Sequence, residues 1–280
     1  MRLRGVRKSS NVEIRRGGGR RAAGVGGLGL TGVLLVLGLS WITGVDFTSL
    51  LSGQSVPVSQ QQAAPTEAEQ RAADFTSRVL ATTEDVWTAR FPEEVGRPYD
   101  PPRLVIFSGV TQSGCGGASG ATGPFYCPLD ETAYLDTQFF ALMSQRLGAG
   151  GDFAAAYVVA HEVAHHVQNE LGILGQVNEM RQRSSQVDAN GLTVRLELQA
   201  DCLSGVWARS VEGLMERGDL DEALNAARQI GDDVLQRRAG RVPQPHTFTH
   251  GTAEQRSRWF NRGFEEGRMA ACDTFGTDRL

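Results

Sequence analysis

The feature that most constrains the fold is an apolar run without Gly or Pro over residues 152–171. Its length and composition predict a buried or half-buried helix. The run contains the sequence His-Glu-Val-Ala-His, in which His161 and His165 are four residues apart. Because residues i and i+4 lie on one face of a helix, the two imidazoles can bind one zinc ion. Glu162 can then hold a water molecule beside the metal and take its proton.

A zinc site that keeps a position open for water needs a third protein ligand. No histidine follows at the short spacing of the H-E-x-x-H-x-x-G-x-x-H type, because position 171 is Leu. A carboxylate from a second helix is the other solution, and Glu197 suits it. Asp201 is one turn further on and can accept the free ring N–H of a zinc-bound histidine. Two alternatives to this metal site remain: histidines that only pack in a helix, and a solvated acidic face.

The first part of the chain has the pattern of a membrane anchor. Residues 1–21 carry eight Lys or Arg and one Glu, and residues 22–45 carry no charged side chain. An uncharged stretch of this length can span a bilayer, and its basic flank predicts a cytoplasmic N-terminus with everything after it outside. A cleaved signal peptide is the alternative. We therefore expect a basic cytoplasmic segment (1–21), a transmembrane helix (22–45), a flexible linker (46–65) and the domain with the zinc motif (66–280).

Charge and cysteine content limit the partners and the compartment. The net charge is −4, and because residues 1–21 contribute +7, the rest of the chain carries −11, which argues against nucleic acid as a partner. The four cysteines would lie in an oxidising compartment, where an even number indicates disulfides. Of three possible pairings we favour Cys115–Cys127 and Cys202–Cys272. A buried free thiol at Cys202 is the alternative.

The remaining patterns predict a fold of the α+β class. A capping box at Thr66 opens a helix to about Arg90, and short strands are expected at 103–107 and 133–135 around a Gly- and Ser-rich loop at 108–130. Helices are expected over nearly everything else, at 137–147, 152–171, 176–187, 192–215, 219–238 and 252–271. We therefore expect a mostly helical domain in which the helix with the zinc motif packs on a small sheet.

Three further side chains could assist chemistry at the metal. His250 lies where a loop meets a capped helix, so it could donate to the negative charge that develops on a substrate carbonyl oxygen or, less favourably, replace a metal ligand. An exposed loop histidine is an equally good interpretation. Tyr157 and, more weakly, Tyr134 are other candidate donors, although a core tyrosine is the simpler interpretation of Tyr157. His166 points about 100° away from His165, so we exclude it from the metal face.

With these residues in hand, the chain resembles the bacterial family called "Putative neutral zinc metallopeptidase", whose members have an N-terminal membrane segment. The resemblance runs from about residue 97 to residue 275. It rests on blocks that follow one another in one order, at 107–109, 113–116, 123–128, 134–136, 151–153, 161–168, 197–202, 231–233 and 248–252.

The resemblance implies a zincin-like fold with one zinc ion, His161 and His165 as ligands and Glu162 as catalytic base. Glu197 as third ligand is similar to the glutamate-type zincins. One departure is Ala164, where the family is expected to have Gly, and it removes no catalytic group. The resemblance supplies no substrate.

Two functional hypotheses of different classes follow. The first is a membrane-anchored zinc metallopeptidase that hydrolyses protein or peptide substrates outside the cytoplasm. The second is a zinc-stabilised binding or scaffold domain at the membrane. The retained Glu162 argues against the second, since a structural zinc site needs no base and is usually closed by four protein ligands. A zinc hydrolase of a cell-wall amide is a weaker third hypothesis, because the sequence shows no wall-binding module.

Overall fold

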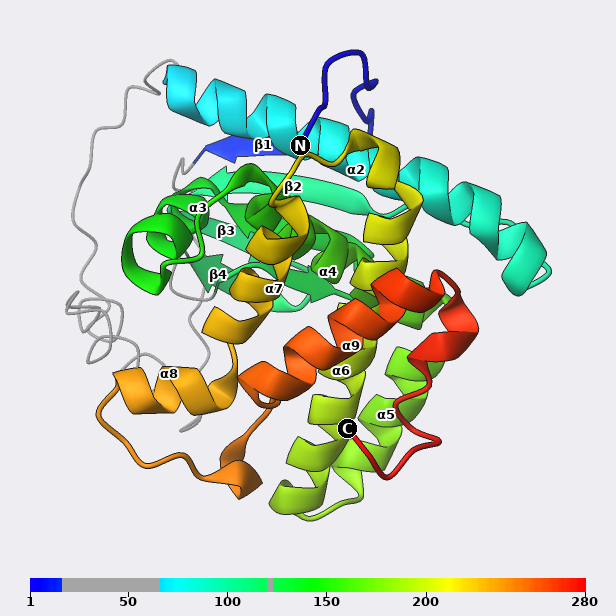
Figure 1. Cartoon of the computed structure of the whole chain (residues 1–280), viewed down its shortest axis with the longest axis vertical. Coiled ribbons are helices and arrows are strands. Elements are labelled where there is room, and N and C mark those ends of the chain that lie inside the picture. The colour runs from blue at the N-terminus through cyan, green and yellow to red at the C-terminus, as the bar shows by residue number, and fades with distance from the viewer. Residues whose placement is uncertain (17–65, 120–122) are drawn as a thin grey trace.

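The computed structural model describes residues 1–16, 66–119 and 123–280 (Figure 1). The described strands are β1 (Val12–Arg16), β2 (Arg103–Ser108), β3 (Val110–Ser113), β4 (Gly116–Ser119), β5 (Phe125–Cys127) and β6 (Thr132–Asp136). The described α-helices are α2 (Glu67–Glu94), α3 (Thr137–Leu142), α4 (Asp152–Glu170), α5 (Ile173–Gln182), α6 (Gln186–Ser210), α7 (Asp219–Gln229), α8 (Asp232–Arg238) and α9 (Ala253–Glu266). A π-helical turn continues α3 over Met143–Leu147.

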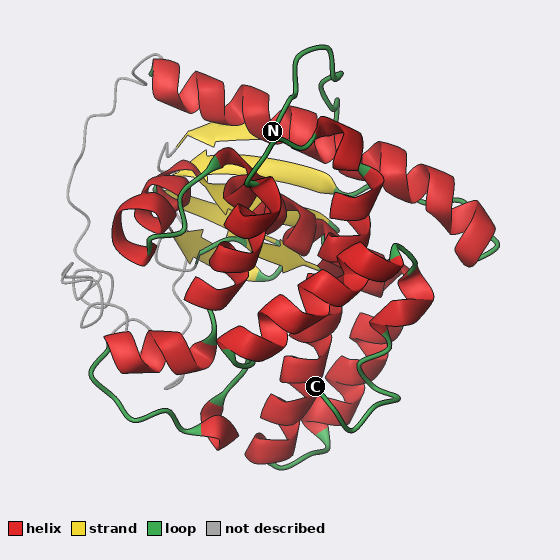
Figure 2. Ribbon diagram, viewed as in Figure 1, coloured by secondary structure: helices red, strands yellow, loops and turns green. Residues whose placement is uncertain are grey.

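Four of the strands form one mixed sheet with the order β1-β2-β6-β5. β1 and β6 run parallel to β2, and β5 runs antiparallel to β6 at the other edge. β3 and β4 form a separate antiparallel hairpin. Helices occupy most of the other described residues, and α4 lies against the sheet, where it contacts β5 and β6 (Figure 2). The expected α+β class, mostly helical with a small sheet, is confirmed.

Helix α4, which carries the zinc motif, begins where the backbone requires a glycine. Gly151 has a φ of 118°, and a Cβ at this position would overlap the Glu222 carboxylate. That carboxylate accepts a hydrogen bond from Phe153 N at 3.0 Å and so caps the first turn, because residue 151 has no side chain to do so. The helix ends before Gly172, whose φ of 74° is the left-handed conformation that closes many helices.

Helices α6 and α9 cross with their backbones in direct contact. A Cβ on Gly205 of α6 would overlap the carbonyl oxygen of Phe260, and a Cβ on Gly263 of α9 would overlap that of Cys202. Only glycine on both helices allows this approach. The crossing therefore holds α9 against the part of α6 that begins just after Asp201.

The structure differs from the expected division of the chain at its N-terminal end. The sequence places residues 1–21 in a separate cytoplasmic segment, but residues 1–16, which we call the arm, belong to the folded body. β1 pairs with β2 from Val12–Leu104 to Arg16–Ser108. The basic composition of the arm hides the alternation of Val12 and Ile14 with charged residues, the pattern of a strand. Ile14 is 56% exposed, so the apolar positions of this alternating pattern are not all buried.

The arm is also held on α2 by a buried carboxylate. Glu84 Oε1 accepts hydrogen bonds from Ser9 Oγ and from Asn11 Nδ2, the latter at 2.9 Å. Its other oxygen lies 2.8 Å from Arg7 Nη2. Because Glu84 is buried and takes all three partners from the arm, its charge depends on the arm for compensation.

The predicted transmembrane helix at 22–45 and the predicted linker at 46–65 lie outside the described residues. Within the ranges that the structure describes, none of the helices combines the length and the apolar composition needed to cross a bilayer.

One expected helix and one expected loop differ from the structure. The helix expected over 219–238 is divided into α7 and α8 at Gly231, whose backbone is extended, with φ −67° and ψ 138°. Gly231 lies so close to the start of α9 that a Cβ there would overlap Ala253. The Gly-rich loop expected at 108–130 contains the β3–β4 hairpin and the edge strand β5. The four-residue strands of the hairpin are too short to give a clear periodic pattern.

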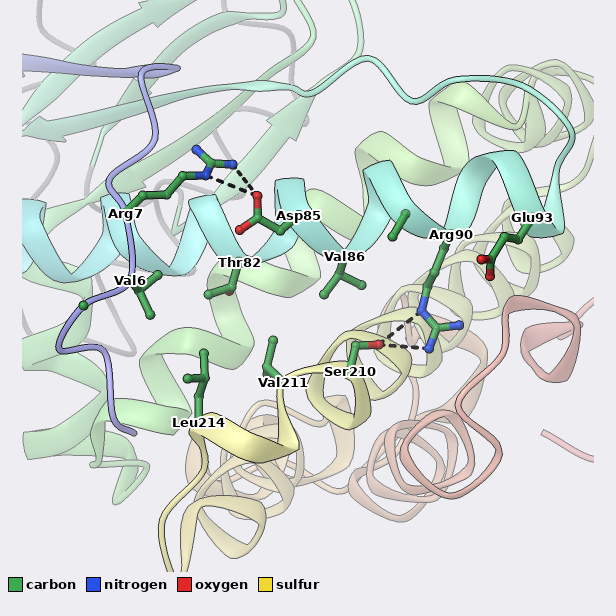
Figure 3. A pocket seen from close by; sticks show the side chains of 12 residues that line it. Val6, Arg7, Thr82, Asp85, Val86, Arg90, Glu93, Ser210, Val211 and Leu214 are labelled. Carbon is green, nitrogen blue, oxygen red and sulfur yellow. Dashed lines mark hydrogen bonds and ion pairs between the residues drawn. The ribbon is translucent and has the colours of Figure 1, made fainter.

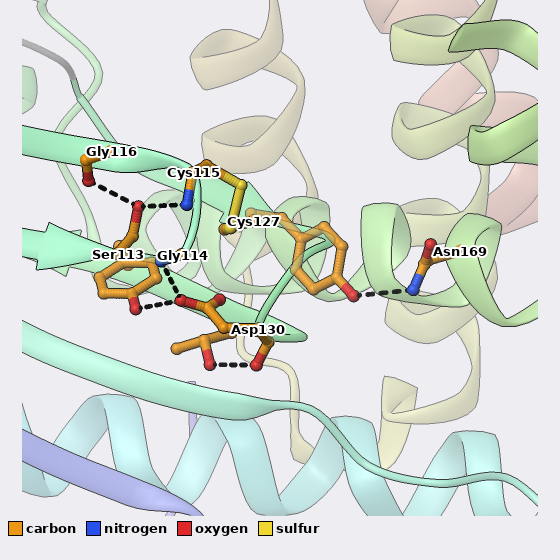
Figure 4. Close-up of a disulfide and its surroundings, with 10 residues drawn as sticks. Ser113, Gly114, Cys115, Gly116, Cys127, Asp130 and Asn169 are labelled. Carbon is orange, nitrogen blue, oxygen red and sulfur yellow. Dashed lines mark hydrogen bonds between the residues drawn. A yellow bond between two sulfur atoms is a disulfide. The ribbon is translucent and has the colours of Figure 1, made fainter. Parts of the chain in front are cut away.

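Both favoured disulfide pairings are confirmed: Cys115 is bonded to Cys127, and Cys202 to Cys272. The first joins the turn of the β3–β4 hairpin to the end of β5 (Figure 4). Beside it, Asp130 Oδ2 accepts hydrogen bonds from Gly114 N at 2.6 Å and from the Tyr134 hydroxyl at 2.7 Å. The disulfide and the hydrogen bonds of the Asp130 carboxylate thus hold the hairpin against the sheet.

We predict that the arm stays bound to the body after the chain between them is cut. A protease site inserted within residues 46–65 of the full chain would be cleaved, and the fragments separated by size-exclusion chromatography and identified by mass. The two fragments are expected to elute together, because the β1–β2 pairing and the contacts of Glu84 do not require a continuous chain.

Glu84→Ala provides the comparison. It removes the acceptor of three arm side chains and is expected to weaken retention of the arm by about 1–3 kcal/mol. Glu93→Ala, at an exposed position of the same helix, is the matched control and should leave retention unchanged. Separation of the fragments in the cut chain without either substitution would show that the arm is not an integral part of the body.

Candidate metal centre

Helices α4 and α6 bring the predicted site residues to one place. His161 and His165 lie one turn apart on α4, and Glu197 and Asp201 lie one turn apart on α6. The two helices contact each other, and the side chains that face each other across them are almost fully buried. Sequence spacing alone predicts each pair, but only the packing of α4 on α6 joins the pairs.

The distances between the ligand atoms fit a zinc ion. One ligand atom each from His161, His165 and Glu197 lie within 4.8 Å of one another. His161 Nε2 is 3.1 Å from Glu197 Oε2, and His165 Nε2 is 3.5 Å from Glu197 Oε1. Ligands at about 2.0–2.1 Å from tetrahedral zinc are separated by about 3.3 Å. Two imidazoles and one carboxylate at this spacing are a donor set that zinc accepts, with a fourth position left for another group.

Both histidine rings are oriented by hydrogen bonds on the side away from this position. His161 Nδ1 donates to Asp201 Oδ1 at 3.0 Å, and His165 Nδ1 donates to Gln168 Oε1 at 2.9 Å. Gln168 is fixed in turn because its Nε2 donates to Leu196 O at 2.7 Å. Each ring therefore directs Nε2 toward Glu197, where a metal ion would bind, and this is the arrangement that outer hydrogen bonds impose on metal-binding histidines.

The electrostatics of the centre favour a cation. Burial opposes ionisation of Glu197, but His165, His250 and His161 outweigh it and hold the pKa of Glu197 well below its usual range. Burial also lowers the pKa of His161, and hydrogen bonds to Asp201 and Glu197 more than reverse this and raise it to about 10. For Asp201, Arg256 and His161 outweigh burial and lower the pKa to about 2. Two buried carboxylates thus stay ionised and need positive charge between them.

Glu162, the base predicted from the sequence, is buried on α4 next to His161. Burial raises the pKa of Glu162, and the neighbouring histidines oppose that rise. A carboxylate whose pKa is moved toward neutrality can both accept and return a proton.

His250 lies in the loop before α9, and its side chain is 48% exposed. It is near enough to the centre to lower the pKa of both Glu162 and Glu197. Asp232 shapes this loop, since its Oδ2 accepts hydrogen bonds from the backbone N–H groups of Thr249, His250 and Gly251 at 2.8, 2.6 and 3.0 Å. His250 thus acts electrostatically on the clustered side chains but is not one of the three clustered ligands.

The other candidate donors do not face the metal position. Tyr157 is buried and its hydroxyl donates to Asp201, so it is a core tyrosine with a structural partner. Tyr134 donates to Asp130 in the sheet. His166 points away, as expected, and donates from Nε2 to Asp100 O at 2.7 Å. Its Nδ1 accepts a hydrogen bond from the Tyr126 hydroxyl at 2.9 Å.

Three residues of the site were missed by sequence reasoning: Gln168, Asp232 and Arg256. Gln168 follows His165 by three residues and so could have been assigned to the same helix face. Arg256 shares the apolar stripe of α9 with Trp259 and Phe260, where a charge indicates a buried partner. Asp232 gives no such signal, because its partners are backbone groups of a distant loop.

A second cluster of potential ligands among the described residues does not match zinc. Asp152, Asp219 and Glu222 bring three carboxylates together, and no histidine or cysteine joins them. The Met1 amino group lies 2.8 Å from Asp152 and 3.3 Å from Asp219, so the arm itself supplies positive charge there. This cluster is explained by the docking of the arm.

A cavity of about 680 Å³ lies between the arm, α2 and the end of α6 (Figure 3). Arg7 pairs with Asp85 across it, and Arg90 donates to Ser210 Oγ at 2.9 Å. None of the residues of the metal centre lines this cavity. This cavity is therefore separate from the candidate metal centre.

The fold and the site together define a class: an α+β protein with a helix-borne H-E-x-x-H sequence and a glutamate from a second helix, spaced to fit zinc. The chain belongs to the family described as "Putative neutral zinc metallopeptidase", whose profile matches residues 1–275. The match includes the arm and so extends well beyond the resemblance that begins near residue 97.

The chain is also similar to individual bacterial proteins. It is 51% identical over 293 residues to the uncharacterized protein YpfJ of Escherichia coli (strain K12), with 99% of both chains covered. It is 42% identical over 219 residues to the uncharacterized protein Rv2575 of Mycobacterium tuberculosis (strain ATCC 25618 / H37Rv), covering 72% of this chain and 71% of that protein. No solved structure gives a significant match to the chain.

We predict that the purified full chain binds one zinc ion and that Glu197→Gln weakens zinc binding by more than about 100-fold. Loss of an outer hydrogen-bond partner costs 10–100-fold in affinity, and loss of one of three ligands should cost more. Zinc content after dialysis and competition with a chelator measure the effect. Glu212→Gln, at an exposed position after α6, should bind zinc as the unmodified chain does. Equal zinc binding by Glu197→Gln would remove Glu197 from the ligand set.

Proposed function

We propose that the protein is a zinc metallopeptidase that hydrolyses peptide bonds in protein or peptide substrates outside the cytoplasm. The observation that carries this proposal is the combination of Glu162 with the clustered ligand atoms of His161, His165 and Glu197. A site with three protein ligands leaves one position for water or substrate, and Glu162 is a base beside that position. Membership of the metallopeptidase family supports the same conclusion.

The residues of the centre can perform the steps of amide hydrolysis. Bound zinc would supply Lewis-acid chemistry, polarising the scissile carbonyl and lowering the pKa of water. Glu162 takes the proton of the attacking water on its carboxylate and returns it to the leaving amine. His250 donates to the carbonyl oxygen as negative charge develops there, from a loop whose backbone is held by Asp232. Asp201 and Gln168 keep the two histidine rings in place.

The competing function is a zinc-stabilised scaffold domain without hydrolysis. A structural zinc site is usually closed by four protein ligands. The cluster in the described part of the chain offers three, and His250 beside it is half exposed. The scaffold hypothesis leaves Glu162 without a role, although burying its carboxylate costs free energy.

The proposed location is at the membrane, with the catalytic body outside the cytoplasm. Two disulfides support an oxidising compartment, and the uncharged residues 22–45 support membrane attachment. The β1–β2 pairing supports a different location for the N-terminus from the cytoplasmic one predicted from the basic flank. A single crossing by residues 22–45 would place the arm and the body on opposite sides of the bilayer, which is incompatible with the pairing of β1 and β2. We therefore propose that the arm lies on the same side of the bilayer as the body.

We predict that Glu162→Gln keeps zinc and loses peptide hydrolysis by about 10²–10⁴-fold, the range that a general base contributes. The full chain, made under oxidising conditions, would be assayed on a mixed library of quenched peptides. The same assay with a chelator, and after zinc is restored, tests the metal requirement. Activity of the unmodified chain should vanish with the chelator and return with zinc. Unchanged turnover in Glu162→Gln would exclude it as the base, and a zinc-loaded chain without activity on any peptide would favour the scaffold function.

We predict that His250→Ala lowers kcat by about 10²–10³-fold on the best peptide from that library, because it removes one donor to the developing oxyanion. KM and zinc content should stay nearly unchanged, since His250 is not one of the three clustered ligands. His246→Ala, in the preceding loop and exposed, is the matched control. Loss of zinc in His250→Ala would instead make His250 a metal ligand.

A further inference from the structure

Arg256 is a buried charge that the proposed chemistry does not use directly. Its side chain is 2% exposed, although it carries a guanidinium group. Arg256 Nε donates to Asp201 Oδ2 at 2.8 Å, and Nη2 donates to Asp201 Oδ1 at 3.0 Å. The same Nη2 lies 3.2 Å from the Tyr157 hydroxyl. The residue thus connects α9 to both helices of the metal centre.

The fold delivers Arg256 to this place through the close crossing of α6 and α9. Gly205 and Gly263 allow the two backbones to touch, and the Cys202–Cys272 bond fastens the chain after α9 to α6 beside Asp201. Arg256 lies two turns before Gly263, on the same face of α9. A long side chain on that face therefore reaches Asp201.

The contact controls the direction in which Asp201 presents its oxygens. A guanidinium is a planar fork that binds both oxygens of a carboxylate and so fixes the plane of the carboxylate as well as its position. With both Asp201 oxygens held by Arg256, Oδ1 is directed to His161 Nδ1 at 3.0 Å. Asp201 is fully buried, so no solvent replaces a lost partner.

We propose that Arg256 is a positioning residue of the metal centre: through Asp201 it fixes the ring of His161 with Nε2 directed to the metal. Arg256 itself contacts neither metal nor substrate. This inference rests on the proposed metal centre, and it adds α9 to the elements that build the centre.

The positive charge of Arg256 and the geometry of its contact with Asp201 should have opposite effects on zinc affinity. A positive charge near zinc repels it, so removal of Arg256 could strengthen metal binding on Coulomb grounds alone. Asp201 lies between Arg256 and His161, however, and the ion pair is neutral as a unit. The repulsion of zinc is thus largely cancelled, and the loss of orientation should decide the outcome. The two effects have opposite signs, so an experiment separates them.

The test measures zinc affinity of the full chain by competition with a chelator. Arg256→Met, which keeps the bulk of the side chain and removes the fork, is expected to lower zinc affinity on the order of tenfold, the lower end of the range for outer partners of a ligand. Arg256→Lys keeps the positive charge but replaces the planar guanidinium with a single ammonium group. Its zinc affinity should lie between that of Arg256→Met and that of the unmodified chain. The absorption spectrum of cobalt(II) in place of zinc should change in Arg256→Met, because the direction of one imidazole changes.

The control separates positioning from general stability. Thr82→Val removes the buried hydrogen bond from Trp207 Nε1 to Thr82 Oγ1, between α2 and α6. It should lower the melting temperature and leave both zinc affinity and the cobalt spectrum unchanged. Should Arg256→Met fail to fold, Arg256→Lys and Tyr157→Phe, which removes one hydroxyl from Asp201, carry the same comparison.

The outcomes distinguish this inference from the proposed function. Unchanged or increased zinc affinity in folded Arg256 variants would overturn the positioning role while leaving the metal centre intact. Absence of zinc binding by the unmodified chain would overturn the metal centre itself. Lower affinity with a changed cobalt spectrum, graded from Lys to Met, is the result that supports the inference.

Discussion

The buried carboxylate of Asp201 is the group on which the arrangement of this protein depends. It accepts hydrogen bonds from His161 and Tyr157 on α4 and from Arg256 on α9, while its own backbone belongs to α6. An ionised group without solvent is tolerated only when it is paired and hydrogen-bonded. Three helices must therefore keep their relative positions, or this charge loses its partners. Because Asp201 needs these partners, it keeps α4 and α6 in the relative position that brings the candidate metal ligands together.

Much of this architecture could be predicted because its signals are local. The capping boxes at Thr66 and Thr252 are both present, since each needs only residues within one turn. His161 and His165 could be assigned to one face from helix periodicity. Glu197 could be chosen because zinc requires a third ligand and the sequence offers no histidine at the short spacing. In this case the coordination requirement of zinc, and not a local sequence pattern, identified a residue on another helix.

What could not be predicted depends on contacts between distant segments. The arm looks like a basic flank because the partners of its strand, and of its polar residues, lie about 70–100 positions later in the chain. Asp232 binds backbone groups of the loop at His250, and such partners leave no residue pattern. The break at Gly231 reflects the approach of α8 to α9. In each case packing of distant elements decides the structure.

The position of β1 has a consequence for how this protein can be shortened. β2 has Leu104, Val105 and Ile106 buried, and β1 covers one edge of that strand. A protein begun at residue 66 would leave the β2 edge open, with unpaired N–H and C=O groups beside an apolar strand. Open edges of this kind are templates for pairing with other chains. In the full chain the edge strand is β1, whose Glu13, Arg15 and Arg16 are charges of the kind that discourage such pairing. A shortened form of the body should therefore keep residues 1–16.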